Sequence, residues 1–62
     1  MRVLIVEDSC DLRGLFARVL RREGFRVYEA ANGREALASV PKVQPDIILT
    51  DVMMPEMGMV QE

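Results

Sequence analysis

Two short runs of consecutive apolar residues constrain this chain more than any other feature of its sequence. They are "VLIV" at residues 3–6 and "IIL" at residues 47–49. Both are shorter than an ordinary helix and rich in β-branched residues, which favours strands. Strands that are apolar on both faces are typical of parallel sheets covered by helices on either side. The two runs therefore predict a layered α/β fold.

The residues that follow the first run show a helical pattern. Apolar residues recur at the i, i+3, i+4, i+7, i+8 spacing of an amphipathic helix, at Leu12, Leu15, Phe16, Val19 and Leu20. Ser9 or Asp11 can cap its start, and Gly24 stands where a helix ends in a left-handed residue. A helix over residues 10–23 is therefore predicted.

A strand and a second helix are expected next. "FRVYEA" alternates apolar and polar residues, as in an edge strand with one wet face. "NGREAL" then offers Asn32 as N-cap with Glu35 three residues on, close to a capping box. Because proline is excluded from helix interiors, Pro41 predicts a short helix that ends at residue 40.

The expected order is β-α-β-α-β in a single domain of 62 residues. Its predicted elements are strand 2–7, helix 10–23, strand 25–30, helix 33–40, strand 46–51 and a C-terminal loop over 52–62. Alternating strands and helices imply a parallel sheet. The two most apolar strands should be adjacent, which gives the spatial order 2-1-3. Right-handed crossovers then place the two helices on opposite faces.

Composition excludes several kinds of function. A net charge of −2, without a basic run or an aromatic platform, argues against nucleic acid as a partner. No apolar run reaches membrane-spanning length, and no signal peptide is recognisable. The chain has no histidine, which removes histidine acid–base catalysis and most zinc sites. The lone Cys10 is expected to be a buried or half-buried, inert thiol in a reducing cytoplasm.

Three carboxylates follow the two apolar strands. Glu7 and Asp8 come after the first, and Asp51 ends the second. Adjacent strands lie about 4.8 Å apart, so these side chains are expected to converge and to repel one another unless a cation neutralises them. Oxygen-only donors favour Mg²⁺. Acidic residues after strands also simply begin loops and cap helices, and spacing alone leaves both interpretations open.

Three segments resemble a known family. "VLIVEDS", "ANGREAL" and "PDIILTDVMMPEM", in this order and spacing, are similar to the first half of the response-regulator receiver domain of bacterial two-component signalling, from residue 2 to about residue 58. The resemblance implies a flavodoxin-like, doubly wound α/β sheet. It also implies that the domain accepts a phosphoryl group from a phosphohistidine on a sensor histidine kinase.

The resemblance assigns roles to individual residues. Asp51 matches the phosphoacceptor, and Glu7 and Asp8 match the acidic pair that holds Mg²⁺ with it. Met53 matches the position whose backbone carbonyl completes the metal site, and Pro55 matches the proline of the following loop. Such a domain is a phosphorylated regulator rather than a conventional enzyme.

The sequence also departs from the family pattern. The small or acidic residue that the family has between Met57 and Gly58 is absent. The family's later helices, last two strands, hydroxyl residue and active-site lysine have no counterpart in the 62 residues. Lys42 precedes the last strand, at the wrong end of the sheet to replace that lysine. We therefore expect weak Mg²⁺ binding and slow or undetectable phosphorylation.

A second hypothesis is that the chain is a half-domain that acts only as a folding and dimerisation unit. The strand at 46–51 is composed for burial but is expected to form an open edge, which invites pairing with a second copy.

Two groups of residues keep both a structural and a binding interpretation. They are the basic residues of the first helix (Arg13, Arg18, Arg21, Arg22), as a solvated face or a kinase-docking patch, and the C-terminal methionines (Met53, Met54, Met57, Met59), as loop packing or a soft binding surface.

Overall fold

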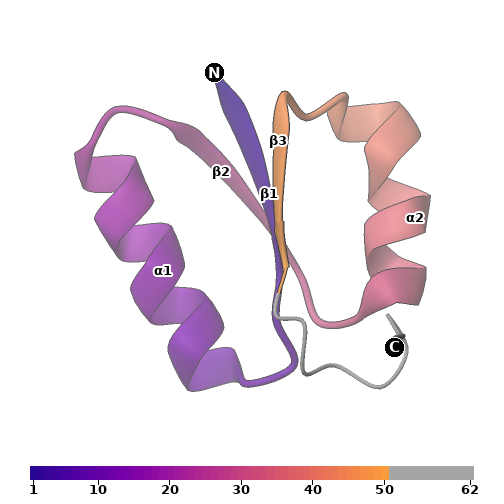
Figure 1. Cartoon of the computed structure of the whole chain (residues 1–62), viewed down its shortest axis with the longest axis horizontal. Coiled ribbons are helices and arrows are strands. Elements are labelled where there is room, and N and C mark those ends of the chain that lie inside the picture. The colour runs from indigo at the N-terminus through magenta and orange to yellow at the C-terminus, as the bar shows by residue number, and fades with distance from the viewer. Residues whose placement is uncertain (51–62) are drawn as a thin grey trace, which may run out of the picture.

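The computed structural model describes residues 1–50 and contains the five expected elements in the expected order. They are β1 (Arg2–Val6), α1 (Cys10–Arg22), β2 (Arg26–Ala30), α2 (Gly33–Val43) and β3 (Ile47–Thr50). The strands form a parallel sheet in the order β2-β1-β3, which confirms the predicted fold class and topology (Figure 1). The predicted loop at 52–62 lies outside the described residues.

β1 is the centre of the structure, and its four apolar residues are at most 3% exposed. Alternate side chains point to opposite faces of a strand. Leu4 and Val6 pack with Ala36 on the α2 side, whereas Val3 and Ile5 pack on the α1 side. The two helices therefore cover opposite faces of the sheet, as right-handed crossovers require (Figure 1).

The ends of α1 follow from local chemistry. Ser9, not Asp11, is the N-cap, and its Oγ accepts a hydrogen bond from the Leu12 N–H at 3.4 Å. At the other end Gly24 adopts φ +96°, a left-handed conformation that costs glycine little. The Gly24 N–H then donates to the Arg21 carbonyl, and the chain turns into β2.

The apolar stripe of α1 is only partly used. Ala17 is the one buried residue of the helix, and Leu20 packs beside it against Val3, Ile5 and Val27. Four members of the predicted stripe remain 39–48% exposed, namely Leu12, Leu15, Phe16 and Val19. The periodicity therefore predicted the helix correctly but not how far its apolar face is covered within residues 1–50.

The prediction that the second helix ends at residue 40 was wrong. α2 continues through Pro41 to Val43, and Gln44, with φ +53°, ends it by donating its N–H to the Val40 carbonyl at 2.8 Å. Pro41 lies in the last turn, where it removes one hydrogen bond to the carbonyl of Leu37. Leu37 is 76% exposed, so water can solvate that carbonyl and the helix tolerates the proline.

The start of α2 agrees with the predicted cap. Asn32 Oδ1 accepts from the Glu35 N–H at 2.9 Å. Glu35 Oε1 reaches back to the Ala31 N–H, also at 2.9 Å, one residue earlier than in the usual capping box. One N–H of the first helical turn and one N–H before the cap are thereby paired, and both bonds restrain the turn between β2 and α2.

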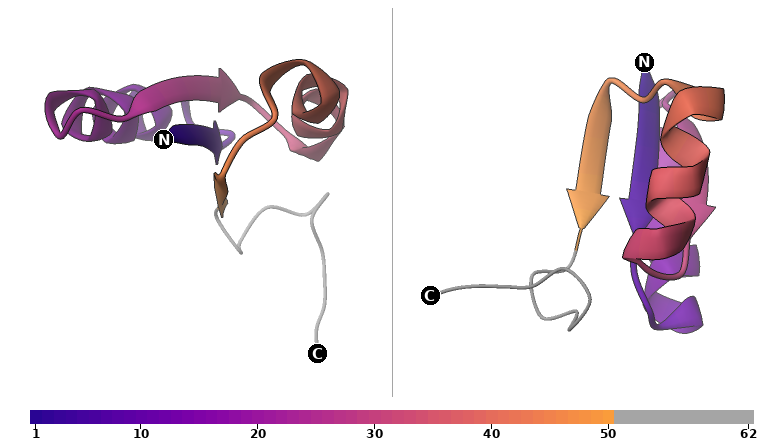
Figure 2. Two further views of the ribbon diagram at one scale, coloured as in Figure 1. Left: turned by 90° about the horizontal axis from the view of Figure 1, so that it is seen from above. Right: turned by 90° about the vertical axis from the view of Figure 1, so that its right-hand side faces the viewer.

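β3 forms an open edge of the sheet. Figure 2 shows it to one side of both helices. Ile47, Ile48 and Leu49 are 45%, 50% and 43% exposed, although they form an apolar run like that of β1. The predicted exposed edge is therefore present among the described residues.

Candidate functional site

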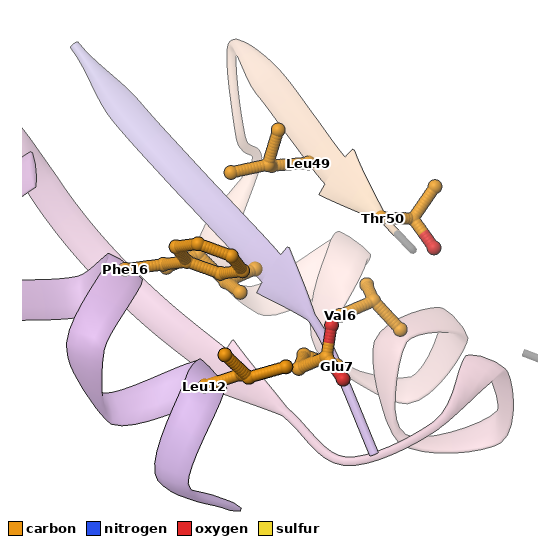
Figure 3. A pocket seen from close by; sticks show the side chains of 7 residues that line it. Val6, Glu7, Leu12, Phe16, Leu49 and Thr50 are labelled. Carbon is orange, nitrogen blue, oxygen red and sulfur yellow. The ribbon is translucent and has the colours of Figure 1, made fainter. Parts of the chain in front are cut away.

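The candidate site lies where β1 and β3 end side by side. Their pairing runs in register from Val3–Ile47 to Val6–Thr50. In the sequence, Glu7 follows Val6 and Asp51 follows Thr50. β1 and β3 flank the point at which the strand order reverses, and parallel α/β sheets bind ligands there, outside the carboxyl ends of the strands. Figure 3 shows Glu7, Val6 and Thr50 at this end of the sheet.

Glu7 is the one buried charged residue among residues 1–50, with 3% of its surface exposed. Its backbone N–H donates to the Ala30 carbonyl of β2 at 3.0 Å, and its carbonyl accepts from Arg13 Nη1 at 2.7 Å. Its carboxylate Oε2 accepts from the Ser9 N–H at 3.2 Å. The residue is therefore held at its backbone and its side chain.

Asp8 is exposed and follows Glu7 directly. The two side chains offer only carboxylate oxygens, which suit Mg²⁺, and a carboxylate as deeply buried as that of Glu7 requires hydrogen bonds or a compensating charge. The pair therefore fits a hard cation. Within residues 1–50 no three acidic, histidine or cysteine side chains form a metal-binding group. Asp51, Met53 and Pro55 lie outside the described residues, so the convergence of three carboxylates stays a prediction.

Arg13, for which the sequence leaves a solvated helix face and a docking patch as interpretations, lies against this site. The side chain of Arg13 is only 19% exposed, and its Nε lies 3.5 Å from Glu29 Oε1 on β2. Arg21 Nη2 lies 3.5 Å from the other oxygen of Glu29 and donates to the Val27 carbonyl at 3.0 Å. Both arginines thus tie α1 to β2, but Arg13 alone also reaches the Glu7 carbonyl.

One sequence signal marked Arg13 as unusual. It is the fourth residue of α1, near the helix N-terminus, where the macrodipole disfavours positive charge. A basic residue there is expected only if a nearby acceptor or anion compensates for that cost. Glu29 is that anion in this structure.

Comparison with known proteins decides the family. The sequence model of the family described as the response regulator receiver domain matches residues 3–59, which is nearly the whole chain. The chain belongs to the response-regulator receiver family. Neither helix of this receiver chain within residues 1–50 has the length and apolar character to cross a membrane.

Two relatives show the extent of the similarity. Sporulation initiation phosphotransferase F of Bacillus subtilis (strain 168) is 41% identical over 56 residues, which are 90% of this chain and 45% of that protein. The chemotaxis protein CheY of Thermotoga maritima is 42% identical over 58 residues, or 92% of this chain and 48% of that protein. The chain spans about half the length of these relatives.

A solved structure agrees with the fold. The chemotaxis response regulator CheY4 of Vibrio cholerae superposes with a TM-score of 0.82 at 45% identity, over 90% of this chain and 47% of that one. The strand order and the two helices of the receiver chain therefore match the corresponding part of a flavodoxin-like receiver domain.

Two open, largely apolar hollows flank β3 of the receiver chain. One, of about 490 Å³, lies on the α1 side and is lined by Ile5, Val6, Glu7, Leu12, Phe16, Leu49 and Thr50 (Figure 3). The other, of about 540 Å³, lies on the α2 side between Leu37, Val40 and Ile48. Because few polar groups line them, these hollows suit packing against apolar side chains better than binding of a small polar ligand.

Proposed function

We propose that this receiver chain accepts a phosphoryl group on Asp51 from a phosphohistidine of a sensor histidine kinase. The observation that carries the proposal is the register of β1 and β3, whose last pair, Val6 and Thr50, directly precedes Glu7 and Asp51 in the sequence. Membership of the receiver family supports it. So does a relative that is named a phosphotransferase.

The transfer is a single displacement at phosphorus. One carboxylate oxygen of Asp51 forms the new P–O bond, the P–N bond to the kinase imidazole breaks, and the released imidazole keeps the electron pair of that bond. Aspartate is a known nucleophile of this kind, and its acyl phosphate is a covalent intermediate. The acceptor must be ionised to attack, and a cation nearby favours the ionised form of a carboxylate.

We also propose that Glu7, Asp8, Asp51 and the backbone carbonyl of Met53 hold Mg²⁺, with weak affinity. When bound, the ion neutralises charge on the oxygens of the phosphoryl group. Glu7 contributes a carboxylate that is fixed by the Ser9 N–H, whereas Asp8 contributes one that is accessible from solvent. A rigid and an adaptable ligand together suit an ion that keeps several of its own waters.

The test uses a small phosphodonor. We expect incubation with acetyl phosphate and Mg²⁺ to add the mass of one phosphoryl group to the intact protein, and Asp51→Asn to abolish the addition. Asp46→Asn is the matched control, because Asp46 lies at the opposite end of β3 and the asparagine keeps an oxygen that can accept the Arg2 N–H. A mass increase that persists in Asp51→Asn, or none in the unchanged protein, would rule the proposal out.

A second candidate function is self-association through β3 in a reducing cytoplasm. The Cys10 thiol is exposed, so the prediction that it is buried or half-buried was wrong, and a reducing compartment keeps such a thiol free. Self-association is favoured by the three apolar residues of β3 that are 43–50% exposed, on a strand that pairs with β1 alone among the strands of residues 1–50. A twofold axis perpendicular to the sheet makes two β3 strands antiparallel neighbours and closes both edges. Light scattering at micromolar concentration should then report a dimer. A folded monomer at that concentration contradicts this candidate.

A further inference from the structure

The peptide unit between Glu7 and Asp8 controls both members of the acidic pair. Its carbonyl belongs to Glu7 and its N–H to Asp8, and the unit is planar. A change of ψ at Glu7 turns this carbonyl and moves Asp8 relative to Glu7, and so changes how the two carboxylates lie relative to each other. Whatever holds the Glu7 carbonyl therefore holds the orientation of the pair.

Arg13 makes that contact. Its Nη1 donates to the Glu7 carbonyl oxygen at 2.7 Å, a short, charge-assisted hydrogen bond. Its backbone N–H donates to the Ser9 carbonyl at 2.9 Å, so the same residue closes the first turn of α1. The connection from Val6 to α1 is thus bound on one side by the Ala30 carbonyl and on the other by Arg13.

Glu29 holds the guanidinium in place. It pairs with Arg13 Nε at 3.5 Å, which leaves Nη1 directed to the Glu7 carbonyl. The planar fork of arginine can make both contacts at once, whereas the single ammonium of lysine is a point charge. Glu29, which also pairs with Arg21, offsets part of the positive charge of Arg13 that would otherwise repel a cation from the nearby acidic pair.

We propose that Arg13 is a positioning residue that fixes the peptide unit between Glu7 and Asp8 and thereby presets both carboxylates for a divalent cation. The role of the pair in cation binding rests on the proposed function. The geometric part of the proposal, in which Arg13 restrains the connection after β1, is independent of the proposed function. Charge and position predict opposite effects here: removing a cationic side chain favours Mg²⁺ electrostatically, whereas releasing the peptide unit disfavours it.

The experiment compares Arg13→Met with Arg21→Met. Both variants remove one positive charge and one contact to Glu29, but only Arg13 touches the Glu7 carbonyl. The first readout is metal-free amide hydrogen exchange at Ser9, whose N–H donates to the Glu7 carboxylate. We expect it to accelerate roughly tenfold or more in Arg13→Met, the size of a lost charge-assisted hydrogen bond, and to change less than about twofold in Arg21→Met.

The second readout is the Mg²⁺ dissociation constant, from the shift of the Asp8 amide resonance. It should rise in Arg13→Met and stay equal or fall in Arg21→Met. Equal exchange at Ser9 in both variants, or tighter Mg²⁺ binding in both, overturns the inference. If the unchanged protein binds no Mg²⁺, the proposed cation site fails, yet Ser9 exchange still decides the role of Arg13.

If Arg13→Met does not fold, Arg13→Lys replaces it. Lysine keeps the charge and the aliphatic stem but cannot contact Glu7 and Glu29 in the same fork. Exchange at Ser9 should then rise by a smaller factor, although the net charge is unchanged. Exchange equal to that of the unchanged protein overturns the inference.

Discussion

β1 and β3 have nearly the same apolar composition but opposite environments. The four apolar residues of β1 are 0–3% exposed, whereas the three of β3 are 43–50% exposed. β1 has a strand on each edge and a helix on each face. β3 has one neighbouring strand within the described part of the chain and lies to one side of both helices (Figures 1 and 2). The comparison shows that apolar composition makes burial of a strand favourable. The neighbouring elements determine how much of the strand is actually buried.

The candidate site depends on both strands. Glu7 leaves the buried strand and is fixed by contacts to β2 and α1. Asp51 follows the exposed strand, which contacts only β1 among the described elements. The proposed site therefore combines residues after β1, which β2 and α1 hold in place, with Asp51 after β3, a strand held by β1 alone among the described elements. The following predictions test that difference.

The largest expected effect comes from a charge placed on each strand at paired positions. Ile5 and Leu49 are register partners, 1% and 43% exposed. Ile5→Lys buries an unpaired ammonium, which costs more than the few kcal/mol of stability that a chain of this size can have. We expect it to unfold the protein in circular dichroism, whereas Leu49→Lys stays folded and becomes monomeric. If both variants unfold, β3 is buried in solution and the comparison fails.

A smaller effect is expected from truncation of paired side chains on the other face of the sheet. Leu4 is 0% exposed and pairs with Ile48, which is 50% exposed. Leu4→Ala should lower the free energy of unfolding by about 3 kcal/mol, because a fully buried side chain leaves a cavity. Ile48→Ala should lower it by about 1 kcal/mol. Urea unfolding measures both, and equal losses would contradict the difference between the strands.

The smallest effect concerns the start of β3. Asp46 makes two hydrogen bonds with the backbone of Arg2. Its N–H donates to the Arg2 carbonyl at 2.9 Å, and its Oδ2 accepts from the Arg2 N–H at 2.8 Å. Asp46→Ala removes the second bond, which is worth about 1 kcal/mol. Hydrogen exchange should accelerate in β3 and stay unchanged between β1 and β2. Equal acceleration in all three strands would show that β3 does not open independently.

Much of this fold could be predicted from local patterns, because each pattern reports a local cause. The apolar runs, the stripe of α1, the Asn32 cap and Gly24 all depend on residues within a few positions of one another. Pro41 misled the prediction because the cost of a proline depends on whether the carbonyl that it leaves unpaired is exposed. Solvent access at Leu37 is a property of the folded chain.

The site could be predicted only in part. Glu7 and Asp8 were found because they directly follow an apolar strand. The role of Arg13 was missed because its contacts join residues on β1, α1 and β2, and side-chain reach across elements leaves no periodic signal. Asp51 was found in the same way, at the end of the second apolar strand, and the family motif assigned it the phosphoacceptor role. Its geometry lies outside the described residues.

The Mg²⁺ dependence of phosphorylation in Glu7→Gln and Asp8→Asn tests the central claim most directly. With acetyl phosphate as donor and intact mass as readout, each variant should slow phosphorylation of Asp51 by at least about tenfold, because loss of a ligand weakens a metal site at least as much as loss of a supporting residue. Asp46→Asn should retain the rate of the unchanged protein. Unchanged rates in both Glu7→Gln and Asp8→Asn would contradict a cation site at the carboxyl end of β1.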